Sequence, residues 1–332
     1  MRRGSRSTST TMLKERLLNK RVLLDAVYSQ SGFLIILIIV LSLTAGLLNP
    51  NFLQLKNFRN IIQQNVSLGI VSVGVGLVLI TGNIEISVGS MISFMGIILS
   101  MLVVQTENIL LAVTVTILIG FALGIINGTI VAKSKVASFI ISLGMLLVYR
   151  GAALVITHGY HFPLEGRFTW IGRENLGGVF PVPILMFILV FIFAFFLLRF
   201  TKYGRMLYAI GGNEKSAYLS GINVDLYKIL NYGLCGALTG FATLILISRL
   251  GVAYSNTGER YALDSLAAVV VGGTSLYGGK GSALGLLLGV IVFGLITNIL
   301  NLVHVDPYWR DVVVGIIIVI AVIIGRLGAA RE

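Results

Sequence analysis

One short polar segment between two apolar stretches carries a carboxylate that could do chemistry inside a membrane. It reads Thr81-Gly-Asn-Ile-Glu-Ile-Ser-Val-Gly-Ser90. A carboxylate next to hydrocarbon costs free energy and usually marks a functional site. Backbone groups freed by glycine breaks are tolerated only against protein or a water-filled cavity. We therefore predict that Asn83, Glu85 and Ser87 line an aqueous translocation path; glycine-rich helix packing is the simpler alternative.

A second glycine-rich segment, Val271–Ser282, has a similar character, and we assign Thr274 and Ser275 to the same path. The segment superficially resembles a phosphate-binding loop, because Lys280 follows a glycine. That loop needs glycine, four residues, glycine, lysine and then serine or threonine. Here Thr274 stands at the first glycine position and Gly281 follows the lysine. We therefore expect that this chain does not bind or hydrolyse ATP itself.

The remaining reactive side chains do not form a pattern typical of an enzyme or a metal site. His158, His161 and His304 fall in or beside predicted outer loops, and solvated histidines are the favoured interpretation. No combination of serine, histidine and acid stands out. We predict no catalytic residues, no metal and no cofactor, and we place an intramembrane enzyme last among the function classes.

Ten apolar runs must position these segments. Of the 332 residues, 56% are hydrophobic and 11% are charged, and the mean hydropathy is +0.96. A soluble domain carries about a quarter charged residues, so lipid is the expected solvent, and a span takes roughly 20 apolar residues. We predict an all-α integral membrane protein with about ten transmembrane helices, over 33–48, 61–80, 90–105, 109–132, 138–157, 182–199, 228–248, 262–272, 282–302 and 312–325. Because the 262–272 run is short, we expect a broken or re-entrant helix there.

The distribution of basic residues predicts the orientation. With the N-terminus inside, seventeen of the 25 Lys and Arg residues fall on the cytoplasmic side, as positive-inside topology requires. The net charge of +12 therefore needs no nucleic-acid partner to explain it. We divide the chain into a basic cytoplasmic segment (1–32), a transmembrane permease domain (33–326) and a cytoplasmic tail (327–332).

The longest cytoplasmic loop, about 200–227, contains signals for a short helix. Asn213 can cap its start, Glu214 lies in its first turn, and Gly221 fits its C-terminal cap. These signals predict about two turns on the cytoplasmic face. A solvated connector is the alternative.

Three segments in order resemble the permeases of bacterial sugar importers of the ATP-binding cassette (ABC) class, the group with the ribose, xylose, galactose and autoinducer-2 permeases. They are Thr81–Ser90, Tyr208–Val224 and Leu263–Gly281, and the resemblance covers about 33–325. Asn298–Leu302 and Tyr308-Trp309 look most like the ribose branch, which favours a ribose-like monosaccharide. Asn83 and Glu85 stand where the family commonly has glycine and aspartate, which bears on the identity of the substrate.

The resemblance implies a larger machine in the bacterial inner membrane. A separate ATPase subunit with two nucleotide-binding domains would bind ATP, and an extracytoplasmic sugar-binding protein would deliver the sugar. A second permease copy or a paralogue would complete a pore at a dimer interface. The cytoplasmic loop would be the coupling helix that docks on the ATPase, through Gly211, Gly212, Asn213, Glu214, Ala217, Leu219 and Gly221.

An ion-coupled secondary transporter of a small polar solute is the alternative function. Such proteins usually hold ionisable groups near the middle of the membrane. Here only Glu85 and Arg150 are candidates. Because no run of the sequence is long and polar enough for a soluble motor domain, we favour the importer whose energy comes from a separate ATPase.

Overall fold

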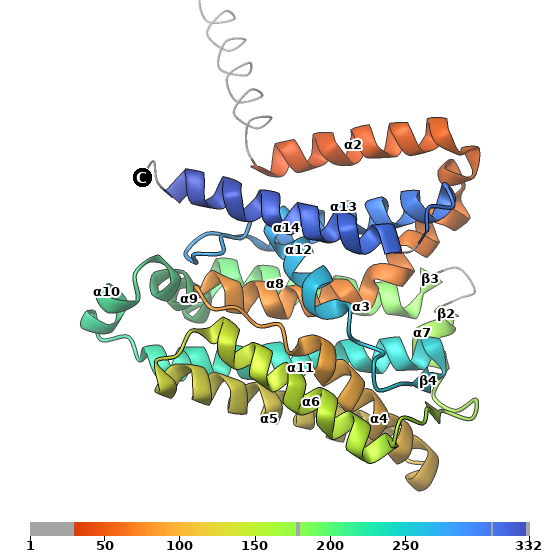
Figure 1. Ribbon diagram of the computed structural model, residues 1–332, viewed down its shortest axis with the longest axis horizontal. Coiled ribbons are helices and arrows are strands. Elements are labelled where there is room, and N and C mark those ends of the chain that lie inside the picture. The colour runs from red at the N-terminus through yellow and green to blue at the C-terminus, as the bar shows by residue number, and fades with distance from the viewer. Residues whose placement is uncertain (1–29, 177–179, 307, 330–332) are drawn as a thin grey trace, which may run out of the picture.

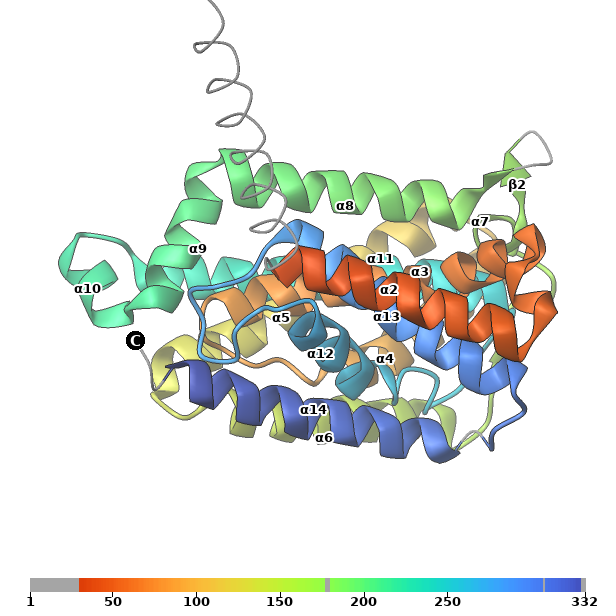
Figure 2. The ribbon, with the colours of Figure 1, turned by 90° about the horizontal axis from the view of Figure 1, so that it is seen from above.

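The long helices of the protein lie side by side along one direction (Figures 1 and 2). The computed structural model describes residues 30–176, 180–306 and 308–329. The helices are α2 (Gln30–Leu48), the 3-10 helix η1 (Pro50–Leu53), α3 (Leu55–Ile80), α4 (Val88–Thr106), α5 (Ile109–Ser134), α6 (Ser138–Thr157), α7 (Trp170–Arg173), α8 (Val182–Phe200), α9 (Lys202–Gly212), α10 (Glu214–Leu219), α11 (Val224–Leu250), α12 (Tyr261–Val271), α13 (Ala283–Leu302) and α14 (Tyr308–Ala329). The antiparallel strand pairs are β1 (Phe162–Pro163) with β4 (Val252–Ala253), and β2 (Asn175–Leu176) with β3 (Phe180–Pro181).

Eight helices in the described part of the chain are long and apolar enough to cross a membrane. They are α2, α3, α4, α5, α6, α8, α11 and α13. The predicted all-α membrane protein is therefore confirmed. The other two predicted runs correspond to α12 and α14. Since α12 has only 11 residues and non-helical residues 272–282 separate it from α13, the predicted break is confirmed as well.

Three helices form the centre of the bundle. α3, α4 and α11 are mostly buried, whereas α2, α5, α6 and α8 expose most of their length. The exposed side chains are apolar, for example Leu43, Leu147 and Leu189. So large an apolar exterior is unfavourable in water, but it matches hydrocarbon. The surface of the bundle is therefore suited to contact lipid.

Glycines allow α5 and α11 to pack with their backbones in contact. A methyl group on Gly124 would lie 2.1 Å from the carbonyl oxygen of Tyr232, and one on Gly236 would lie 2.0 Å from that of Gly120. Small residues at four-residue spacing, such as Gly120 and Gly124, give helices in membranes this close approach. Much of the glycine content therefore serves helix packing.

The two ends of the bundle differ. At one end, called here the α10 end, lie α9, α10, the start of α2 and the end of α14 (Figures 1 and 2). At the other, called the α7 end, lie α7 and both strand pairs. Residues 1–29 of the predicted N-terminal segment and the last three residues of the predicted tail lie outside the described residues.

The 200–227 loop contains more helix than we predicted. The predicted short helix is confirmed as α10, but α9 before it was not predicted. Its start does carry a capping signal, because Oγ1 of Thr201 accepts a hydrogen bond from the backbone N–H of Gly204 at 3.1 Å. The loop is therefore a pair of helices rather than one helix in a connector.

Candidate functional site

The local sequence explains both ends of α10. The side chain of Asn213 accepts a hydrogen bond from the N–H of Ser216 at 2.9 Å, which caps the N-terminus. Gly221 follows the C-terminus with φ +84°, a conformation that favours glycine. Ala217 is buried in the cluster that contains Ile210, whereas Leu219 is 75% exposed. α10 therefore packs by one face and carries an apolar residue on its exposed face.

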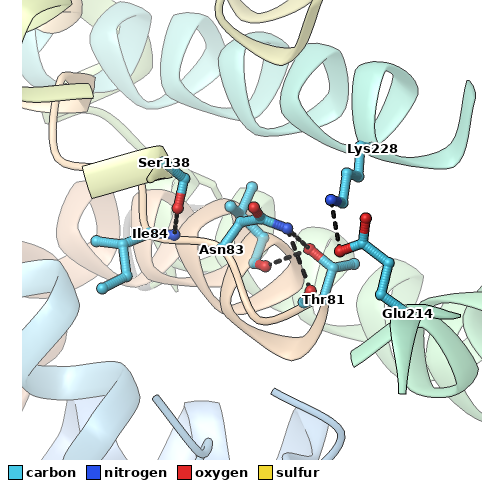
Figure 3. A network of polar contacts seen from close by, with 7 residues as sticks. Thr81, Asn83, Ile84, Ser138, Glu214 and Lys228 are labelled. Atoms are coloured by element: carbon cyan, nitrogen blue, oxygen red, sulfur yellow. Dashed lines mark hydrogen bonds and ion pairs between the residues drawn. The ribbon is translucent and has the colours of Figure 1, made fainter. Parts of the chain in front are cut away.

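An ion pair fastens α10 to the central helix α11. Nζ of Lys228 lies 2.7 Å from Oε2 of Glu214, and the lysine side chain is almost completely buried (Figure 3). Because removing water from a lysine is costly without a partner, Glu214 is the group that keeps this charge satisfied. A displacement of α10 would therefore act directly on α11.

The C-terminus of α9 contacts both predicted glycine breaks. A methyl group on Gly211 would lie 1.8 Å from the carbonyl oxygen of Ile80 and 2.5 Å from the backbone nitrogen of Gly279. Gly279 N–H itself donates to the Ile80 carbonyl at 2.9 Å. A methyl group on Gly278 would lie 2.6 Å from the backbone nitrogen of Gly82, and both glycines have positive φ. We call this contact of Ile80–Gly82, Gly211-Gly212 and Gly278-Gly279 the glycine junction; it joins three segments that are far apart in the sequence.

Glu85 is inside the fold rather than on an open surface. It is 2% exposed, and its carboxylate accepts hydrogen bonds from the backbone N–H of Ser87 at 2.5 Å and from Nδ2 of Asn127 at 2.9 Å. The same Nδ2 donates to Oγ of Ser87, and the hydroxyl of Tyr149 donates to Oδ1 of Asn127 at 2.7 Å. The carboxylate is thus held by neutral donors from α5 and its own turn.

The backbone between α3 and α4 is tied to its neighbours. The N–H groups of Ile84 and Ile86 donate to the hydroxyls of Ser138 and Ser142 on α6, at 3.0 and 2.7 Å. Nδ2 of Asn83 donates to the Thr81 carbonyl and hydroxyl, both at 3.1 Å (Figure 3). These bonds satisfy backbone groups that a break in a membrane helix would otherwise leave unpaired.

The second group of predicted pathway residues lies in the turn between α12 and α13. Thr274 is buried and its hydroxyl has no hydrogen-bond partner among the described residues. Ser275 is half-buried, and its hydroxyl accepts from the N–H of Tyr277 at 3.2 Å. The glycine junction brings this turn against the Ile80–Gly82 turn. No hydrogen bond joins the predicted side chains of the two turns in the described part of the chain.

A cavity of about 750 Å³ lies at the α7 end, where Gly172 and Arg173 of α7 form part of its lining. Its lining is predominantly polar, and it includes none of the five predicted pathway residues. Six helices and the segment before α12 supply the lining residues: Asn60, Gln63, Gln64, Asn65, Leu68, Gly172, Arg173, Arg249, Asn256, Thr257, Glu259, Arg260, Tyr261, Asp264, Thr297 and Arg310.

Sequence reasoning missed this cavity because its residues are far apart in the chain. One local signal exists on α3, where Asn60, Gln63 and Gln64 have the spacing that places side chains on one face of a helix. A deeper feature has no local signal: Oδ2 of Asp264 on α12 lies 2.5 Å from Nη2 of Arg310 on α14. The arrangement can hydrogen-bond a small polar ligand from several sides.

Comparisons with known proteins agree on one kind of molecule. A family model described as "Branched-chain amino acid transport system / permease component" matches residues 57–322. The ribose import permease protein RbsC of Escherichia coli (strain K12) is 40% identical over 87% of this chain and 92% of its own length. The ribose import permease protein RbsC of Bacillus subtilis (strain 168) is 41% identical over 94% of this chain and 97% of its own length.

A more distant relative has another sugar in its name. The galactose/methyl galactoside import permease protein MglC of Escherichia coli (strain K12) is 31% identical over 95% of this chain and 99% of its own length. No solved structure gave a significant match.

Proposed function

Because the chain belongs to the branched-chain amino acid transport system / permease component family and is the permease subunit of an ABC-class sugar importer, we propose that ribose or a ribose-like monosaccharide is its substrate. The family description names amino acids. The relatives at 40% and 41% identity are named for ribose, and the sugar relative at 31% also covers nearly the whole chain. This full-length similarity supports a monosaccharide.

We place the α10 end in the cytoplasm of a bacterium, with ten crossings of the inner membrane and both termini inside. The eight long helices and α14 would supply nine crossings, and α12 with residues 272–282 would supply the tenth. Lys202, Arg205 and Lys215 lie on α9 and α10, where positive-inside topology requires them.

In this assignment α10 is the contact with a separate ATPase that has two nucleotide-binding domains. Leu219 would contact the ATPase. Asn213 and Gly221 would define the two ends of α10. Glu214 and Ala217 would hold α10 against the rest of the bundle. Gly211 and Gly212 would then pass the displacement to the glycine junction. ATP itself would be bound by the ATPase, because a permease subunit is a transport component and not an enzyme.

The pathway assignment of Asn83, Glu85, Ser87, Thr274 and Ser275 is part of the same proposal. Both turns meet at the glycine junction, so a movement of α9 would shift them together and would open polar atoms that are now covered. A second permease copy or a paralogue would complete the pore, and an extracytoplasmic sugar-binding protein would dock at the α7 end.

Uptake by the complete complex tests this function. The subunit would be reconstituted in proteoliposomes with its ATPase and its sugar-binding protein. We expect uptake of labelled ribose that needs ATP, the ATPase and the binding protein together. Accumulation of the sugar against a gradient by the isolated subunit, driven by an ion gradient alone, would instead show a secondary transporter.

A further inference from the structure

Neutral hydrogen-bonding groups without partners gather in the α7-end cavity. The side chains of Asn60 and Gln64 on α3, and of Asn256 before α12, have no hydrogen-bond partner in the described part of the chain. Each amide offers two donors and one carbonyl acceptor. A sugar hydroxyl both donates and accepts, so this wall can bind several hydroxyls of a small polyol.

The carboxylates of the cavity, in contrast, already have partners. Each lies within 4 Å of a guanidinium group, and so does the carboxylate of a neighbouring aspartate. The pairs are Asp264 with Arg310 at 2.5 Å, Asp311 with Arg260 at 3.5 Å, and Glu259 with Arg150 at 3.3 Å. No acidic side chain in the lining is therefore left to attract a cation.

The two other arginines of the lining are bound to the backbone. Arg173 donates to the carbonyls of Arg249 and Leu250, and Arg249 donates to that of Gln63. Nε of Arg310 has no partner among the described residues, but protein atoms cover it. The backbone bonds of Arg173 and Arg249 hold their two guanidinium groups against the wall of the cavity. The amides of Asn60, Gln64 and Asn256 are then the neutral groups with both donors and acceptors available to a ligand.

The size and the apolar part of the lining suit a monosaccharide. About 750 Å³ lies within the roughly 300–1,000 Å³ of ordinary small-molecule sites. Tyr261 and Leu68 add apolar surface beside the amides, and an aromatic ring of this kind can pack against the C–H face of a sugar.

We propose that this cavity is a binding site for one neutral monosaccharide within a single subunit, occupied after the sugar leaves its delivery protein. The inference rests on the proposed function and adds a site to it. Asn60 and Gln64 would bind the hydroxyls directly, and the Asp264–Arg310 pair would hold α12 and α14 in position around the sugar.

The test uses the complete complex in proteoliposomes with the double variant Asn60→Ala/Gln64→Ala. We expect ribose uptake per subunit to fall about tenfold, as the loss of two hydrogen bonds predicts, while ATP hydrolysis stimulated by the sugar-loaded binding protein persists. Persistent stimulation also shows that the variant is folded. Gln105→Ala is the matched control, because Gln105 is an exposed amide near the same end of the bundle but outside the cavity; its uptake should equal that of the wild type.

Three results would overturn the inference while leaving the permease function intact. One is unchanged uptake in the double variant. Another is a weaker affinity for the binding protein at an unchanged maximal rate, which would make the cavity a protein-docking surface. The last is binding of ribose 5-phosphate, but not of ribose, to the wild-type complex without its binding protein, which would indicate an anion site. Absence of any sugar uptake by the wild-type complex would instead contradict the proposed function.

Discussion

Gly211 and Gly212 are neighbours in the sequence, but the space around them differs completely. Gly211 faces the Ile80 carbonyl at a distance that a methyl group cannot occupy, whereas nothing lies within 4 Å of the position of a methyl group on Gly212. A substitution at Gly212 changes only the freedom of the backbone at the end of α9, whereas a substitution at Gly211 also breaks a close contact. Comparing the two variants therefore separates these effects.

We expect Gly211→Ala to reduce ATP-dependent uptake at least tenfold, because the added methyl group would force the glycine junction apart. Gly212→Ala should leave uptake within about twofold of the wild type, since exposed substitutions of this kind have small effects. Uptake and ATP hydrolysis in proteoliposomes measure both. Equal loss in the two variants would show that the contact at Gly211 is not what matters.

Glu85 allows a second prediction at this scale. Replacing it with alanine would leave the N–H of Ser87 and one N–H of the Asn127 amide buried without an acceptor, at a cost of about 1–3 kcal/mol in the free energy of unfolding. Thermal unfolding in detergent should show this as a lower midpoint. Glu85→Gln keeps a hydrogen-bond acceptor and should therefore fold. Because the proposed energy source is the separate ATPase and not an ion bound at Glu85, sugar uptake by this variant should remain fully dependent on ATP.

The contrary result for Glu85 is also clear. If the glutamine variant lost uptake while the alanine variant unfolded at the wild-type temperature, the charge of the carboxylate would matter more than its hydrogen bonds. Glu85 would then have the ion-coupling role expected of a secondary transporter.

At the scale of elements, the α5–α11 interface depends on glycine for its close contact. We expect Gly124→Leu to destabilise the protein by about 1–3 kcal/mol or more, as overpacking does, because the side chain would meet the Tyr232 carbonyl. Gly144→Leu on α6 is the control, since nothing lies within 4 Å of its Cβ position. Equal midpoints of thermal unfolding in detergent for the two variants would contradict a close interface.

The elements also show what a sequence can predict. Apolar runs predicted the long helices because lipid imposes a length on each span, and a capping residue predicted α10 because the signal lies within four residues. α9 has a similar cap at Thr201. We did not predict α9, because its mixture of polar, apolar and glycine residues gives no clear helical pattern. The cavity and the hydrogen bonds of Glu85 depend on residues such as Asn127 and Arg310, which only the folded chain brings near, so no local pattern could predict them.

For the whole molecule, the orientation can be tested with single cysteines. Cys235 is the sole cysteine of the sequence and is buried, so the wild type should not react with a membrane-impermeant maleimide. We expect Lys215→Cys on α10 to react only in inverted membrane vesicles, and Gln105→Cys near the α7 end to react in spheroplasts. The opposite pattern would reverse the proposed orientation.

The contacts at the glycine junction are made by main-chain atoms, whereas the cavity at the α7 end is made by side chains, and the two share no residue. A peptide unit is the same whatever the side chain beside it. The glycine junction, which would receive the movement of α9, therefore need not change when the transported sugar changes. Substitutions around Asn60 and Gln64 could therefore adapt the protein to a new sugar while its transmission stayed intact, which makes this subunit a practical starting point for redirecting nutrient import.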